Sequence, residues 1–185
     1  GRNQVRVEGA GSHWHNQGLL VIGGGNSAAG QASEVVLRDG GALRSAGGLI
    51  VREGSALAFQ GTGGSVVVAS TLLEGDIQVD AGADATWTGS IEMAHGSWLI
   101  VDGALTLNGD LAMNGYSILE NDGQVTFAGR VSTYDDQVLF GGGLRVFSGG
   151  LAVGGDRLGH NLAMGSTRFT ASNVFTAQLA RSSHD

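Results

Sequence analysis

The chain has 185 residues, of which 34 are glycine, and it contains no proline and no cysteine. Its formal net charge is −7, and reading the sequence shows that all 10 of its Lys-plus-Arg residues are arginine. These counts exclude a disulfide scaffold, a thiolate metal site, a catalytic cysteine and a Schiff-base lysine. The negative charge, with no run of arginines, argues against nucleic-acid binding.

The chain is expected to be ordered, because 42% of its residues are hydrophobic and can bury a core. No stretch reaches the roughly 18 consecutive apolar residues of a membrane span. The start at Gly1-Arg2-Asn3, without methionine, suggests a processed or excised segment, so any export signal is expected outside this chain.

A short repeat begins at Ala104, with the units ALTLNG, DLAMNGY, SILENDG and QVTFAGR in succession. Within a unit, apolar residues alternate with small or polar ones, which is typical of a strand with one buried face. Each unit ends in residues that favour sharp corners. The structural corners predicted from this pattern are Asn108, Gly109, Asn114, Gly115, Asp122 and Gly123.

Three such strands form one rung of about 20 residues, and stacked rungs pair their backbones in parallel. The fold class predicted is therefore all-β, a right-handed parallel β-helix, or β-solenoid. An antiparallel sandwich would need turn signals every 8–12 residues, which is wider than the spacing of these units. The absence of proline also favours the solenoid, because nearly every backbone N–H is needed in its long ladder. If the Asn-containing corners repeat from rung to rung, amide ladders are expected along the rod.

A single solenoid domain is expected over residues 1–171, with a C-terminal cap or irregular tail over 172–185. The segment SNVFTAQLAR, residues 172–181, has an N-cap and helical spacing, so it is either a short capping helix, which we favour slightly, or one more irregular rung. Aromatic residues such as Trp87 and Phe127 are expected to fill the interior. The glycine-rich stretch 23–33 is expected to protrude as a loop.

The segment from Gln4 to Ala56 resembles the β-helix repeat of bacterial autotransporter passengers and related surface-exported proteins. The pattern V-x-V-x-G-x-G-S-x-W matches at Val5, Val7, Gly9, Gly11, Ser12 and Trp14. It continues as N-x-G-x-L-x-V-G and L-x-x-G-G-x-L/V at Asn16, Gly18, Leu20, Gly23, Leu37, Gly40, Gly41 and Leu43. The resemblance implies export to the bacterial surface and a role in adhesion, autoaggregation or biofilm, and it does not imply an enzyme. No C-terminal membrane barrel follows in this sequence.

Two histidines are the only candidate metal ligands, and they are weak ones. His13 and His15 flank Trp14, so an extended backbone places both imidazoles on one face and Trp14 inward. Two ligands do not make a site, so a solvated strand face is the favoured interpretation. We predict no cofactor.

Several carboxylates raise the alternative of a carbohydrate-cleaving β-helix. Asp76, Asp80 and Asp84 are four residues apart, and Asp135 and Asp136 are adjacent. Because most of the acids follow a strand and precede glycine, corner roles are favoured. The Gly-Gly-Gly runs lack the Lys-Ser/Thr of a phosphate loop, and His160 has no accompanying G-x-S-x-G elbow.

The sequence thus predicts a non-catalytic structural β-solenoid at the cell surface or outside the cell. Contacts with glycans of a host, a neighbouring cell or the matrix are compatible with this role. The alternative is a filament protomer that self-associates head to tail through its ends or flanks, since open solenoid ends expose unpaired strands.

Overall fold

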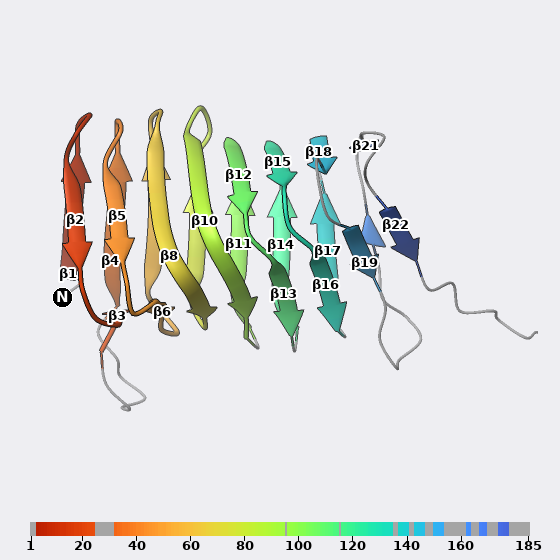
Figure 1. Ribbon diagram of the computed structural model, residues 1–185, viewed down its shortest axis with the longest axis horizontal. Helices are drawn as coiled ribbons and strands as arrows, with labels where there is room; N and C mark the ends of the chain where they lie inside the picture. The colour runs from red at the N-terminus through yellow and green to blue at the C-terminus, as the bar shows by residue number, and fades with distance from the viewer. Residues whose placement is uncertain are drawn as a thin grey trace, which may run out of the picture.

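Parallel strands stack along one axis in the computed structural model, which forms a β-solenoid with its N-terminal strands at one end (Figure 1). The structure describes residues 3–24, 32–94, 96–114 and 116–134, together with the backbone of six strand segments between residues 137 and 177. Side chains are described as far as Ser132. Within this part of the chain there is no helix, and so none that is long and apolar enough to cross a membrane. The predicted parallel β-solenoid is confirmed.

One face of the coil is an eight-stranded sheet to which each rung contributes one strand. Ala56 pairs with Asp76, 20 residues later, and Asp76 pairs with Trp98, 22 residues later, close to the predicted rung length. In spatial order the strands are β1 (Asn3–Glu8), β4 (Ser33–Arg38), β7 (Ala56–Gln60), β9 (Asp76–Val79), β11 (Trp98–Val101), β14 (Ile118–Asn121), β17 (Gln137–Phe140) and β20 (Leu162–Ala163).

The rest of each rung belongs to a 14-stranded sheet, which wraps around the other side of the core. Its strands, in chain order, are β2 (His13–Asn16), β3 (Leu20–Ile22), β5 (Ala42–Ser45), β6 (Leu49–Val51), β8 (Gly64–Leu73), β10 (Asp84–Met93), β12 (Ala104–Asn108), β13 (Leu111–Asn114), β15 (Gln124–Phe127), β16 (Val131–Tyr134), β18 (Gly143–Val146), β19 (Gly150–Val153), β21 (Thr167–Phe169) and β22 (Val174–Ala177).

The prediction of three short strands per rung is wrong for two rungs in the middle of the rod. There β8 and β10 each run for 10 residues through the place where other rungs have a corner. The register between β8 and β10 shifts between Thr88 and Ser90, and Gly89 between them has φ +119°. A β-bulge therefore replaces the corner. The extra residue of a bulge changes the direction of the strand, while pairing continues on both sides of it.

The capping helix expected over 172–181 is also wrong where the structure describes that segment. Residues Val174–Ala177 form strand β22, which pairs in parallel with β19. Val, Phe and Thr favour a pleated strand. The free edge of β19 offers backbone partners to such a strand, whereas a short helix would have to form its first turn without them. The alternative of one more rung describes these four residues. The rest of 172–185 lies outside the described residues.

The core consists of columns of apolar side chains, one from each rung. One column on the eight-stranded sheet is Val35, Leu57, Ile77, Leu99 and Leu119, all buried and in register. Trp87 and Phe127, which were predicted to be internal, are fully buried on the opposite sheet. Phe59 packs edge-on against Trp87, with ring centroids 6.3 Å apart. Burial of each such large side chain contributes about 1.5–3 kcal/mol to the stability of the fold. Because these side chains stack from rung to rung, each rung is stabilised by both of its neighbours.

Candidate functional site

The predicted corner residues lie at or beside strand ends. Asn108 ends β12 and is exposed, whereas Asn114 ends β13 and donates a hydrogen bond from Nδ2 to Glu92 Oε1, at 3.3 Å. Asp122 directly follows β14, and its backbone N–H donates to the carbonyl of Val101 in the preceding rung, at 2.9 Å. These contacts are structural, since they join one rung to the next. Gly115 lies outside the described residues.

Gly109 and Gly123 occupy corners for a different reason from the one that the sequence suggested. Neither residue has a left-handed φ, so conformational freedom does not require glycine there. A Cβ on Gly123 would instead overlap the carbonyl oxygen of Gly103, and a Cβ on Gly109 would overlap that of Gly89. The backbones of stacked corners approach too closely for any side chain, which is a packing requirement.

The expected amide ladder is absent at Asn108, Asn114 and Asn121, the asparagines that the repeat places at successive corners. The register partner of Asn108 in the preceding rung is Thr88, and that of Asn121 is Val101. Asn114 pairs with Tyr134 in the following rung. Asn121 is completely buried in an otherwise apolar column, and its Oδ1 accepts a hydrogen bond from the Gly123 N–H, at 3.1 Å. Because a buried amide needs partners, Asn121 closes the corner from inside the core.

His13 and His15 lie on the same exposed face of β2, with Trp14 between them packed against the core. In the next rung their register partners are Ala42 and Arg44. An arginine beside His15 opposes binding of a cation, because like charges repel. Across the part of the chain that the structure describes, no group of three or more His, Cys, Asp or Glu side chains has an arrangement that could hold a metal ion.

The three described carboxylates considered for glycosidic chemistry lie at the start of β9 and on either side of the corner between β9 and β10. Asp76 begins β9, Asp80 opens the corner after β9, and Asp84 begins β10 directly after that corner. Burial raises the pKa of Asp76, whose neighbours in register are Ala56 and Trp98. Asp135, Asp136 and His160 lie outside the described residues, as do Gly25 and the Gly141–Gly142 pair of the glycine runs.

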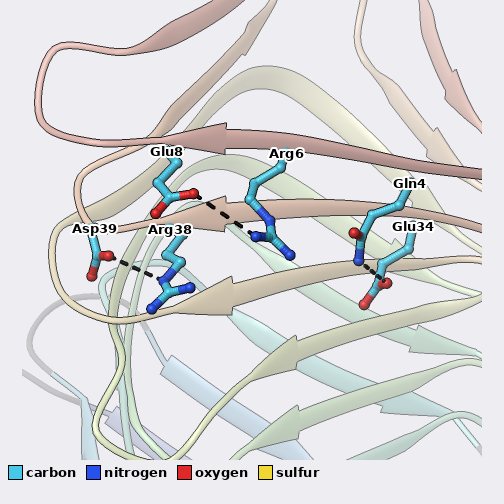
Figure 2. Close-up of polar contacts among 6 residues, drawn as sticks. All are labelled: Gln4, Arg6, Glu8, Glu34, Arg38 and Asp39. Atoms are coloured by element: carbon cyan, nitrogen blue, oxygen red, sulfur yellow. Dashed lines mark hydrogen bonds and ion pairs between the residues drawn. The ribbon is translucent and has the colours of Figure 1, made fainter.

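The outer surface of the first rungs carries exposed polar pairs. Figure 2 shows Gln4 donating to Glu34 Oε2 at 2.8 Å, between β1 and β4, and the neighbouring pairs Arg6–Glu8 and Arg38–Asp39 at 4.0 and 3.1 Å. Such exposed pairs are screened by water and contribute little to stability, about 0–1 kcal/mol each. They make this flank a hydrated surface of mixed charge.

Two exposed aromatic residues further along the rod were not singled out from the sequence. Trp98 is 37% exposed on the outer face of β11, and Tyr116 is 58% exposed just before β14. Trp98 begins the run Trp-Leu-Ile-Val, in which Leu99 and Val101 are buried, so alternation assigns Trp98 to the outer face. Because all four residues of this run are apolar, the sequence alone does not show which of them face outward.

A hydroxyl column on the other sheet was likewise missed. Ser65, Thr86, Thr106 and Thr126 are register partners on successive strands and alternate with core residues. Thr pairs across strands stabilise a sheet, and the spacing of 20 residues between the three threonines was visible in the sequence.

Comparison of the chain with protein-family models, curated proteins and solved structures gives no match.

Proposed function

We propose that this chain is a non-catalytic, structural part of a β-solenoid at the bacterial surface or outside the cell, acting in adhesion, autoaggregation or biofilm. The observation that supports this role most directly is the unbroken apolar interior. Buried side chains between Val35 and Val131 form one continuous core cluster, so the rungs between them have no seam at which the rod would bend. A stiff rod of this kind separates binding surfaces from a cell and presents its flanks to other surfaces.

The resemblance over residues 4–56 to the passengers of autotransporters adds to this proposal. Seven of its matching residues have a structural role that the coil requires. Trp14 and Leu20 are half-buried against the core, and Leu37 and Leu43 are fully buried. Gly9, Gly23 and Gly40 have left-handed φ angles at corners. The matched pattern is thus one of coil geometry, with outward positions left free for contacts.

Location and aggregation are tested separately. Antibodies raised against the chain should label intact cells of the source organism without permeabilisation, whereas labelling only after permeabilisation would contradict a surface role. Beads coated with the purified chain should clump more than beads coated with an unrelated protein of equal net charge. Beads that stay equally dispersed would remove autoaggregation from the proposal.

Head-to-tail stacking is a second candidate function, supported by the first rung. Val5 is 44% exposed and Val7 and Trp14 are half-buried, while their partners in the next rung, Val35, Leu37 and Leu43, are buried. Among the described residues, β1, β2 and β3 pair on one side only. The first rung therefore presents apolar columns and free backbone groups that another rung would cover.

Stacking is tested by sedimentation and electron microscopy of the 185-residue chain. We expect rods longer than one molecule, and we expect Val5→Lys to abolish them by placing a charge on the stacking surface. Gln4→Lys, on the outward side of the same strand, is the matched control and should leave the rods intact. Monomers alone at high concentration of the unmodified chain would exclude this function.

A further inference from the structure

An outward-facing surface formed by β9, β11 and β14 differs from the rest of the described rod in carrying exposed aromatic rings. Alternation buries Ile77, Leu99 and Leu119 in these strands and turns their neighbours outward. We name this surface the aromatic face. It is formed by Asp76, Trp98, Ile100, Tyr116, Ile118 and Glu120.

Strand register places the members of the aromatic face next to one another. Trp98 pairs with Asp76 on one side and with Ile118 on the other, and Ile100 pairs with Glu120. Adjacent strands are about 4.8 Å apart, so these side chains are immediate neighbours. Trp98 thus lies between Asp76 and Ile118, with the carboxylate of Glu120 on the strand of Ile118.

Tyr116 extends the aromatic face at the corner before β14. Because Ile118 pairs with Trp98, the counterpart of Tyr116 in the preceding rung is Gly96. Both have left-handed φ angles, +61° for Tyr116 and +77° for Gly96. A bulky residue adopts this conformation at a cost, yet the ring of Tyr116 remains mostly exposed to solvent.

The charge of the aromatic face is negative. Strands β9, β11 and β14 have the sequences DIQV, WLIV and ILEN, which include two carboxylates and no arginine. Asp102 and Asp122 follow β11 and β14 and are exposed at the adjoining corner. Within the described residues, none of these four carboxylates forms an ion pair. The field of this face attracts cations and repels anions.

A guanidinium group fits both properties of the aromatic face. Its planar cation stacks on Trp and Tyr rings, and its N–H groups pair with carboxylates. Lysine is more strongly hydrated and offers no planar face for stacking. We propose that the aromatic face is a docking surface for an arginine-rich segment of a partner protein, with guanidinium groups stacking on Trp98 and Tyr116 and pairing with Glu120 and Asp76.

This inference goes beyond the proposed function, since it concerns the chemistry of a partner and holds wherever the protein is located. It is tested by calorimetric titration of the purified chain with a synthetic peptide of nine arginines. We expect Trp98→Ala to weaken binding by about two- to thirtyfold, the range of a lost cation–π contact. Glu120→Gln should also weaken binding, and Glu53→Gln, at an exposed corner between β6 and β7, is the matched control.

The salt dependence of binding and the comparison of an arginine peptide with a lysine peptide complete the test. Raising NaCl from about 0.01 M to about 1 M shortens the Debye length from about 30 Å to about 3 Å, so binding should weaken strongly. A peptide of nine lysines should bind more weakly than the arginine peptide. Unchanged thermal melting of each variant shows that the chain is folded.

Three results would overturn the proposal. The first is equal loss of binding in Glu120→Gln and Glu53→Gln, which indicates attraction to the net charge alone. The second is undiminished binding by Trp98→Ala. The third is binding of a neutral oligosaccharide that depends on Trp98 and is insensitive to salt, with no binding of the arginine peptide, which would assign the face to a glycan.

Discussion

Gly123 lies directly over Gly103 of the preceding rung, so close that a Cβ on Gly123 would overlap the Gly103 carbonyl oxygen. The Gly123 N–H meanwhile donates to the carbonyl of Val101, at 2.8 Å. The corner thus combines a hydrogen bond between rungs with a backbone contact that excludes side chains. Corners of this type allow the rungs to stack at the spacing of a β-sheet.

We expect Gly123→Ala to destabilise the solenoid. Overpacking costs about 1–3 kcal/mol, which lowers the melting temperature of a chain of this size by about 2–12 °C. Thermal denaturation followed by circular dichroism measures the change. Gly18→Ala is the matched control, because a Cβ at Gly18 meets no atom within 4 Å and Gly18 has no left-handed φ. A melting temperature for Gly123→Ala equal to that of Gly18→Ala would contradict the packing explanation.

The repeat and its alternation were sufficient to predict the fold. A rung of about 20 residues and inward Trp87 and Phe127 follow from local spacing, since residues two apart along a strand share a face. The long strands β8 and β10 could not be predicted in the same way. Glycine marks the predicted corners elsewhere in the sequence, but at Gly89 pairing on both sides continues the strand through a bulge.

The positions of Asn121 and Trp98 depend on register between rungs, which local patterns do not give. Asn121 looked like a corner residue because it precedes Asp122-Gly123. Pairing with Val101 instead places it in a buried column. Trp98 begins a hydrophobic run that suggests a buried strand, yet its first residue faces outward beside Asp76. Aligning the rungs by register, rather than by composition, identifies both.

Core packing and surface ion pairs are expected to contribute very differently to stability. Phe59 is fully buried against Trp87, so Phe59→Ala should lower the free energy of unfolding by about 3–5 kcal/mol. Arg52 Nη1 lies 2.7 Å from Glu74 Oε2, but both side chains are partly exposed, so Glu74→Gln should cost below about 1 kcal/mol. Urea denaturation compares the two variants. Similar losses for both would show that the rod depends on its surface charges.

Zinc is expected to leave the stability of the chain unchanged. A ligand that binds only the folded state raises its melting temperature, and His13 and His15 are the only exposed histidine pair on one strand of the described chain. Arg44 next to His15 opposes a cation there. Melting curves with and without excess Zn²⁺ test this. A rise that disappears in His13→Ala would establish a site, and a rise that persists in that variant would place the binding elsewhere.

Asp76 is expected to make stability depend on pH. Burial raises its pKa above the ordinary value of 3.8, and its register neighbours Ala56 and Trp98 supply no compensating charge. The folded chain then binds the proton more tightly than the unfolded chain. This tighter proton binding contributes to the stability of the folded chain. The contribution is complete below about pH 3.8 and is lost as the pH rises through the folded-state pKa of Asp76.

Asp76→Asn preserves the shape of the side chain and leaves this half-buried position uncharged at every pH. The variant should therefore be more stable than the unmodified chain at pH 7, and the difference should shrink as the pH falls towards 3.8. Thermal melting at both pH values measures it. Asp102→Asn, at an exposed corner, removes the same charge from the chain and separates burial from the general effect of net charge. Equal stabilisation by the two substitutions at pH 7 would show that burial of Asp76 is not the cause.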